Sequence, residues 1–306
     1  MTGEMKLFNK NASTIICLSK LFLRMDEGEK VPTFEELSNE FSVARGTIQN
    51  SLKVLQDEGA IEILPRGRKG TYLIRKDIAK LIRLADIRSF LGAMSLPYSR
   101  TYEGLATGLI HTLVNEYQIP VNMSYMRDAA ERIDEMLSGR VDFVIVSKLS
   151  AGIAIEKGKA IEIVKDFGPR SYLSYHVIVF GNPLKREIED GMIVGLAKNA
   201  FSQNERVRRM CEGKNVTFKE VDYDQMLSKI KHNEIHATVW NRDEINDALI
   251  QINMVPIYSD EESTEAVLVV DQRRPELIKL FEELVDVQQV TEIQHQVIEG
   301  KMSPKY

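Results

Sequence analysis

The stretch that most constrains the fold is residues 32–73, whose pattern predicts two short helices, a tight turn and a hairpin. Thr33 is followed three residues later by Glu36, and this capping box predicts a helix from residue 34. A second helix should begin near Arg45, and Gly59 suits its left-handed end. The apolar residues of this second helix recur at helical spacing and should pack inward: Ile48, Leu52 and Leu55.

Polar side chains occupy another face of the second helix, since Arg45, Gln49 and Lys53 are four residues apart. The hairpin that follows, with strands at 60–64 and 71–74, carries a basic tip flanked by glycines. In a helix-turn-helix the second helix enters the DNA major groove, while a wing of this kind meets phosphate. The alternative is a small helical domain with a solvated charged face, but the basic wing favours DNA. The predicted DNA-contacting residues are Thr33, Arg45, Thr47, Gln49, Asn50, Lys53, Arg66, Arg68, Lys69 and Thr71.

The same stretch resembles the winged helix of the GntR family. The shared motifs are Pro32-x-x-x-x-Leu37, Val43-x-Arg45, Thr47-Ile48, Leu52-x-x-Leu55, Glu58-Gly59 and Gly67-Arg68-x-Gly70-Thr71-Tyr72. Two positions depart from the family pattern. Ala44 stands where the family usually has a serine helix cap, and Gln49 stands where it usually has an arginine. The resemblance therefore implies double-stranded DNA as a partner, with a changed operator sequence.

The length and charge of the chain place this DNA affinity in a small part of it. At 306 residues the chain is too long for one winged helix and suits two or three domains. The net charge is −5, but residues 1–76 carry 12 Lys and Arg against 10 Asp and Glu, whereas the remainder carries 28 against 35. The larger part would repel phosphate, so contacts with DNA should be confined to the second helix and the wing.

Cysteine usage and hydropathy exclude several classes of protein. Only Cys17 and Cys211 occur, which predicts neither a disulfide framework nor a cysteine metal site. No apolar run reaches membrane-spanning length, and the apolar amino-terminal stretch is interrupted by Lys20. We therefore expect a cytoplasmic protein without a cofactor, a metal or a membrane partner.

The chain should begin with a winged-helix domain at 1–76, in which residues 1–10 are loose and 13–25 form a helix. Residues 77–88 read as a helical linker to a second domain at 89–306. There, strand and helix patterns alternate, which argues for mostly parallel α/β sheets. The predicted strands are 90–95, 121–126, 141–146, 161–167, 192–196, 216–221 and 237–240, and the predicted helices are 102–117, 128–138, 203–211, 223–232 and 275–299.

Two strand-like segments, 172–180 and 265–270, should cross between two similar lobes. Lobe 1 would comprise about 89–171 and 265–306, and lobe 2 about 181–258. This is the type 2 periplasmic-binding-protein plan. The fold class expected is thus an α+β winged helix-turn-helix followed by a two-lobed α/β domain of that plan.

Particular strings resemble the YhfZ family of GntR-like regulators over nearly the whole chain. They are Arg66-Gly-Arg68, Leu96-Pro-Tyr98, Arg100-x-Tyr-Glu-Gly-Leu105, Val144-x-Val-Ser147, Val239-Trp-Asn241 and Thr264-Glu-Ala-Val267. The resemblance implies a sensor but does not identify what it senses.

A ligand should bind where strands end at the cleft between the lobes. The predicted ligand-binding residues are Ser95, Tyr98, Ser99, Arg100, Arg127, Ser147, Lys148, Lys198, Ser202, Trp240, Asn241, Thr264 and Glu265. Any one of them could equally cap a helix or be a surface charge. Together they place cations and hydroxyls on one rim, which favours a small anionic or zwitterionic effector.

Signals of catalysis are weak. His232 and His236 are four residues apart, but Asn233 stands where a zincin needs glutamate, and surface histidines are the simpler interpretation. We therefore expect a ligand-responsive transcriptional regulator with no catalytic residue, acting as a homodimer. Two alternatives stay open: an enzyme of the two-lobed fold, dehydratase- or deaminase-like, fused to a DNA-binding domain, and a structural DNA-binding protein whose second domain only dimerises.

Overall fold

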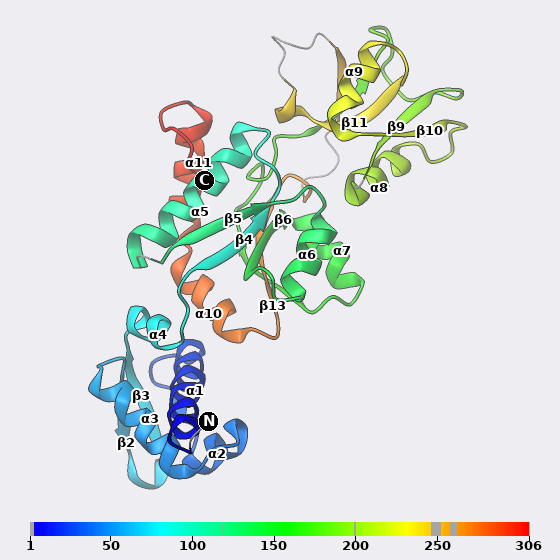
Figure 1. The fold of residues 1–306 in the computed structure, drawn as a ribbon. Helices are drawn as coiled ribbons and strands as arrows, with labels where there is room; N and C mark the ends of the chain where they lie inside the picture. Colours follow the sequence, from blue (N-terminus) through cyan, green and yellow to red (C-terminus); the bar gives the residue numbers. More distant parts are fainter. Residues whose placement is uncertain (1–2, 118, 199, 246–251, 258–261, 306) are drawn as a thin grey trace. The chain divides into compact units, whose positions relative to one another are not determined.

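The computed structural model describes residues 3–117, 119–198, 200–245, 252–257 and 262–305. The chain divides into two compact units. The first unit comprises Met1–Phe90, Tyr117–Pro120 and Arg274–Leu284, and the second comprises Leu91–Glu116, Val121–Arg273 and Val285–Tyr306. Figure 1 labels the helices and strands in chain order. Among the described residues, no helix has both the length and the apolar character needed to cross a membrane.

The first unit is a helix-turn-helix with a wing, as predicted. Its elements are α1 (Gly3–Arg24), β1 (Lys30–Val31), α2 (Phe34–Phe41), α3 (Arg45–Asp57), β2 (Ile61–Pro65), a 3₁₀ turn η1 (Gly67–Lys69), β3 (Thr71–Lys76), α4 (Ile78–Leu84) and α10 (Pro275–Leu284). Both hydrogen bonds of the capping box between Thr33 and Glu36 are present at the start of α2. Ser42 ends α2 with a left-handed φ of 52°, and Gly59 follows α3 with a φ of 64°. The three strands form an antiparallel sheet in the order β1-β3-β2.

Helix α1 organises the core of this unit, because it packs against α3, α4 and α10. The buried apolar side chains include Leu18, Phe22, Leu37, Ile48, Leu55 and Leu73. Helix α1 begins at Gly3, so the expectation of a loose stretch at 1–10 is wrong. The segment interpreted as a linker contributes α4, whose Leu81 and Ile82 are buried.

The second unit contains two lobes, each built on a five-stranded sheet. Lobe 1 has the strand order β5-β4-β6-β13-β7 and lobe 2 has β10-β9-β11-β8-β12. The elements of lobe 1 are β4 (Phe90–Met94), α5 (Arg100–Tyr117), β5 (Val121–Tyr125), α6 (Ala129–Leu137), β6 (Phe143–Ser147), α7 (Lys148–Glu156), β7 (Ile161–Asp166), β13 (Ala266–Asp271) and α11 (Val287–Ile298). Those of lobe 2 are β8 (His176–Phe180), β9 (Ile193–Ala197), α8 (Phe201–Met210), β10 (Thr217–Val221), η2 (Tyr223–Gln225), α9 (Met226–Lys231), β11 (Ala237–Asn241), η3 (Arg242–Glu244) and β12 (Asn253–Ile257).

The sheets are mixed rather than mostly parallel. Strand β4 is parallel to β6, and β9 is parallel to β10 and β11. The two crossing strands run the other way: β13 is antiparallel to β6 and β7, and β8 is antiparallel to β11 and β12. All residues of β13 are buried, as is usual for strands covered on both faces, so the apolar run did not reveal its direction.

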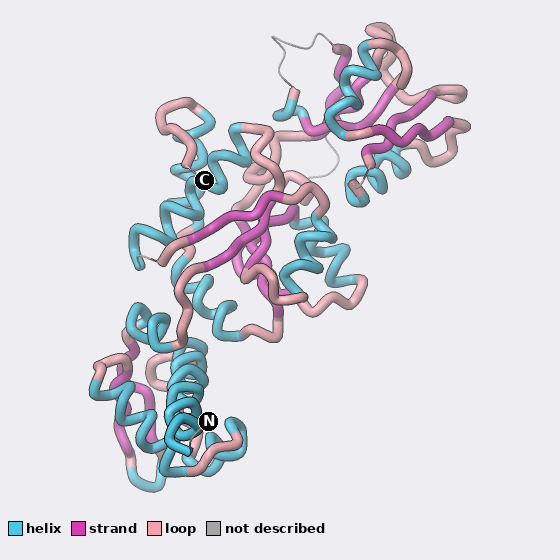
Figure 2. The backbone as a smooth tube through the Cα atoms, in the orientation of Figure 1, coloured by secondary structure: helices cyan, strands magenta, loops and turns pink. Residues whose placement is uncertain are grey.

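Helices cover both faces of the sheet in lobe 1 (Figure 2). On one face, Val144, Val146, Val267 and Val269 share a core with residues of α6 and α7. Helices α5 and α11 approach closely through small residues, since a Cβ at Gly108 would lie only 2.5 Å from the carbonyl oxygen of Val290. These layers hold the ends of β4, β5 and β6, where the ligand site was expected.

The helices differ from the expectation in two places. The closing helix predicted at 275–299 is divided into α10 and α11, because Asp286 caps α11 and accepts a hydrogen bond from the Gln289 amide. Helix α7 was not predicted. It follows β6 without a loop, since Ser147 ends the strand and caps the helix through the Ser150 amide.

Candidate DNA-binding surface and ligand cavity

The candidate DNA-binding surface of the first unit lies on the side of α3 that faces away from the core of the unit. Ile48, Leu52 and Leu55 are buried, whereas Arg45, Gln49, Asn50 and Lys53 are exposed and Thr47 is half-buried. The Arg45 guanidinium lies 5.3 Å from the ring centroid of Phe34 in α2. The structure thus gives α3 one apolar face and one polar, outward face.

The wing presents a cluster of cations at its tip, since Arg66, Arg68 and Lys69 are all exposed around η1. In the part of the chain that the structure describes, no carboxylate forms an ion pair with these three side chains. The Arg66 guanidinium lies 4.8 Å from the Tyr72 ring centroid, which holds it along β3. Gly70 closes the tip with a φ of 98° that favours glycine.

The remaining two residues predicted to contact DNA, Thr33 and Thr71, take part in the secondary structure of the first unit. The Thr33 hydroxyl accepts the Glu36 amide at the start of α2 and lies on the exposed side of the unit. Thr71 is half-buried and pairs with Val31 and Pro65 in the wing sheet.

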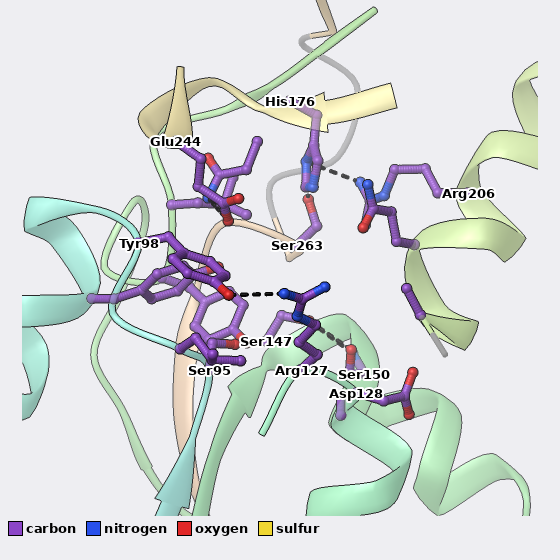
Figure 3. A pocket seen from close by; sticks show the side chains of 18 of the residues that line it. Ser95, Tyr98, Arg127, Asp128, Ser147, Ser150, His176, Arg206, Glu244 and Ser263 are labelled. Atoms are coloured by element: carbon purple, nitrogen blue, oxygen red, sulfur yellow. Dashed lines mark hydrogen bonds between the residues drawn. The ribbon is translucent and has the colours of Figure 1, made fainter. Parts of the chain in front are cut away.

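A cavity of about 140 Å³ lies between the two lobes of the second unit (Figure 3). Five of the residues predicted from the sequence line it: Ser95, Tyr98, Arg127, Ser147 and Asn241. They come from the ends of β4, β5, β6 and β11, as expected for a ligand site at strand ends.

Aromatic side chains from both lobes meet at one wall of the cavity. The rings of Tyr98 and Tyr223 are stacked at 6.1 Å, and Trp240 lies 4.3 Å beyond Tyr223, buried and outside the lining. Arg127 from lobe 1 donates to the Tyr98 hydroxyl at 2.9 Å, and its guanidinium lies 4.4 Å from the Tyr223 centroid. This cluster joins lobe 1 to lobe 2.

Other residues predicted for the ligand site do not line this cavity. Three of the four cations expected to converge there are ion-paired instead: Arg100 with Glu103, Lys148 with Asp166 and Glu265, and Lys198 with Asp222. These three side chains therefore do not line this cavity, and their contact with a ligand stays a prediction. The carboxylates beside Lys148, Asp166 above all, raise its pKa, so the ammonium group stays protonated and its charge is balanced by these two neighbours.

The last predicted residues have local roles or are not described. The Ser99 hydroxyl accepts the Tyr102 amide near the start of α5. The Thr264 hydroxyl accepts the Arg170 amide, and Thr264 and Glu265 are buried. Ser202 lies outside the residues whose side chains the structure describes.

Arg132 lines the cavity and was missed by the sequence reasoning. It is only 1% exposed, and its Nη1 atom donates to the carbonyl groups of Met126 and Arg127. Its Nη2 atom donates to the Tyr172 hydroxyl at 3.0 Å, and its Nε atom has no hydrogen-bond partner. The signal was available, because Arg132 stands among the buried positions of α6 with Ile133.

Lobe 2 contributes three further lining residues that were missed, Glu244, His176 and Arg206. Glu244 is hydrogen-bonded by the Tyr223 hydroxyl and by Asn241, and burial is the main cause that raises its pKa. The Arg206 Nη1 atom lies 3.2 Å from the His176 Nδ1 atom. Burial, and next the charge of Arg206, lowers the pKa of His176 to about 3. His176 is therefore a neutral ring at physiological pH.

The lining is thus rich in hydrogen-bond donors and in positive charge, which suits an acceptor-rich ligand. Among the described residues, no group of three or more His, Cys, Asp and Glu is arranged to hold a metal ion. The lobes also contact each other beside the cavity, where Asp243 accepts from the Thr101 hydroxyl at 3.1 Å and from the Ser174 amide at 2.8 Å.

Two protein-family models match this chain, and together they cover most of it. Residues 77–306 match the family model of the YhfZ C-terminal domain, and residues 26–73 match that of a helix-turn-helix domain. The chain is 30% identical over 301 residues to the uncharacterized protein YhfZ of Escherichia coli K12. The aligned region covers 97% of this chain and 98% of that protein.

Solved structures support the same fold. The crystal structure of YhfZ from Shigella flexneri matches with a TM-score of 0.54 and 26% identity, over 72% of this chain and all of that chain. An ancestral arginine-binding protein bound to arginine matches with a TM-score of 0.50 and 14% identity, over 70% of this chain and 96% of that chain. The second likeness concerns the fold alone and confirms the two-lobed binding-protein plan.

Proposed function

This chain belongs to the YhfZ family, and from that premise we propose that it is a DNA-binding transcriptional regulator whose second unit senses a small anionic or zwitterionic ligand. The observation that carries the proposal is the division of α3 into a buried face and a polar face. Beside α3, the three cations of the wing tip have no carboxylate partner among the described residues. The helix-turn-helix match covers this same stretch.

The DNA-binding half of the proposal assigns different roles to α3 and to the wing. Arg45 and Gln49 are side chains that can form bidentate hydrogen bonds with base edges in the major groove. Arg68 and Lys69 at the wing tip would contact phosphate, which fixes the orientation without reading sequence. Together these contacts support specific binding to an operator.

The sensing half rests on the cavity between the lobes. Its lining combines the buried Arg132 with Arg127, and Arg127 contacts aromatic rings from both lobes. A ligand that contacts both walls would favour one arrangement of the lobes over another, which is the requirement for a sensor.

We further propose that the protein acts as a homodimer. One winged helix reads only a few base pairs, and two copies related by a twofold axis would read half-sites roughly 34–36 Å apart or a multiple of that spacing. The apolar residues of α10 are buried within the chain and are not available for a dimer contact: Leu277, Leu280, Phe281 and Leu284. A dimer contact must therefore use another surface.

The proposal is tested by selecting operator sequences from random duplex DNA with the purified full chain. We expect an enriched palindrome, and sedimentation of the complex should show two chains per duplex. A triple charge reversal of the wing, with Arg66, Arg68 and Lys69 changed to Glu, should abolish the selection. Undiminished binding by that variant, or no enrichment by the unmodified chain, would contradict the proposal.

A further inference from the structure

Building on the proposed sensing role, we infer that the loop after β4, residues 95–98, binds a carboxylate group of the ligand through the hydroxyls of Ser95 and Tyr98. Both side chains line the cavity from lobe 1. Each hydroxyl ends a chain of hydrogen-bond donors that starts at an arginine. This direction of the hydrogen bonds makes both hydroxyls donors toward the cavity.

The chain that ends at Ser95 starts at Arg132, whose side chain is buried. A guanidinium can only donate, so the Tyr172 oxygen accepts from the Arg132 Nη2 atom at 3.0 Å. The Tyr172 hydroxyl keeps one proton, and among the described residues its one acceptor is Ser95 Oγ, at 2.6 Å. Tyr172 therefore donates to Ser95, and the Ser95 proton is left for an acceptor in the cavity.

The chain that ends at Tyr98 is shorter and starts at Arg127. The Arg127 Nη2 atom donates to the Tyr98 hydroxyl at 2.9 Å, as Figure 3 shows. Within the described part of the chain, no acceptor receives the Tyr98 proton. The Tyr98 side chain is 44% exposed, so its hydroxyl can reach a bound molecule. One loop thus offers two hydroxyl protons from positions three residues apart.

The backbone of the loop holds these donors in place without a ligand. The Tyr98 amide donates to the Leu96 carbonyl at 2.8 Å and closes a three-residue turn with Pro97 at its centre. Proline fixes φ near −65°, a value that this kind of turn accommodates. Because the loop is already ordered, binding a ligand costs less conformational entropy.

The direction of the two chains selects the chemical group that binds. Hydrogen bonds in a chain polarise one another, so an arginine at the start strengthens the donor at the end. An ionised carboxylate only accepts, whereas an amide or an ammonium group would place its own N–H groups against the hydroxyl protons. Hydrogen bonds to a carboxylate are also roughly twice as strong as those between neutral groups. The loop therefore favours a carboxylate.

The cavity size limits the body of the ligand. A volume of about 140 Å³ is close to that of a protein cavity, roughly 150 Å³, that accommodates benzene. Butyrate has as many non-hydrogen atoms as benzene and is therefore an appropriate probe. The rings of Tyr98 and Tyr223 border the cavity and suit its apolar chain, which inorganic phosphate lacks.

The experiment is calorimetric titration of the full chain with butyrate, butyramide and inorganic phosphate. Butyramide has the same shape as butyrate but is neutral and carries N–H donors. We expect butyrate to bind at least tenfold more tightly than either, a difference of about 1.4 kcal/mol. Ser95→Ala should reduce butyrate affinity to that of butyramide. Ser138→Ala, whose exposed hydroxyl lies outside the lining, should change neither affinity.

Tyr172→Phe tests the positioning role of Tyr172, because it removes the hydroxyl and keeps the ring that packs against Tyr102 at 5.1 Å. It should weaken butyrate about threefold and leave butyramide unchanged, whereas a distorted cavity would weaken both alike. Circular dichroism checks that each variant folds.

Three results would overturn the carboxylate site: butyramide or phosphate binding as tightly as butyrate, unchanged butyrate affinity in Ser95→Ala, or no binding of butyrate. Equal weakening of butyrate and butyramide in Tyr172→Phe would overturn the chain from Arg132. Operator binding by the ligand-free chain, measured by fluorescence anisotropy on the same preparation, tests the regulator proposal separately. The carboxylate site can therefore fail while that proposal stands.

Discussion

Replacement of Arg68 and Lys69 by alanine should weaken DNA binding to all sequences alike and make it less sensitive to salt. Both side chains are exposed at the wing tip and have no carboxylate partner among the described residues, so each can contact a phosphate. Each phosphate contact contributes about 0.9 to the slope of log affinity against log salt concentration. Loss of two contacts per chain should lower the slope by about 1.8, or by about 3.6 for a dimer.

The size of this effect can be checked directly. Between 50 and 200 mM salt, a slope change of 1.8 corresponds to about one order of magnitude in affinity per chain. Fluorescence anisotropy titrations at four salt concentrations, with a selected operator and a scrambled duplex, measure both slopes. The matched control is Lys219→Ala with Arg209→Ala, which removes two exposed cations from lobe 2 and should leave the slope unchanged. An unchanged slope in the wing variant, or a loss confined to the operator, would refute phosphate contact by the wing.

Three other predictions concern stability. Ala44 begins α3 in extended geometry without a side-chain cap, so Ala44→Ser should raise the free energy of unfolding by about 0.5–2 kcal/mol in urea denaturation. Glu283 pairs at 2.9 Å with Lys76, whose side chain is only 7% exposed; Glu283→Gln should therefore cost about 1–3 kcal/mol by calorimetry, whereas exposed Glu282→Gln should cost little. The folded-state pKa of His176, about 3, lies below its unfolded value near 6.5. The unfolded chain therefore binds the extra proton as pH falls, and stability should drop by at most about 2 kcal/mol from pH 7 to pH 5, a loss that His176→Gln should remove.

The first unit could be predicted in detail because its determinants are local in sequence. The capping box of Thr33 and Glu36, the inward spacing of Ile48 and Leu52, and the glycine at position 59 each act over three to seven residues. Such interactions depend only on residues that are close in sequence, so they can be predicted without knowledge of the tertiary contacts. In contrast, the direction of β13 depends on which strands it pairs with, and the apolar run at residues 266–270 carries no information on that choice.

The cavity lining was predicted only in part, because residues that interact in the structure come from distant parts of the chain. Lys148 lies at a strand end as expected, but it forms ion pairs with Asp166 and Glu265. Both carboxylates are far from Lys148 in the sequence, so the pattern did not predict these pairs. Arg132 was passed over because a charged residue within a helix is ordinarily exposed. Its position on the buried face of α6, beside Ile133, is the pattern that identifies such a residue in a sequence.

The chain connectivity suggests how sensing could reach the DNA-binding unit. Strand β13 starts three residues after Ser263, which borders the cavity, and it leads directly into α10, which belongs to the first unit and packs against α1. A ligand alters DNA binding only through its different affinities for two states of the protein, and a tenfold effect requires about 1.4 kcal/mol. One charged hydrogen bond contributes about 1.5–3 kcal/mol. A single charged contact between the ligand and the cavity lining that forms in only one state is therefore sufficient, and regulation needs no extensive rearrangement of either lobe.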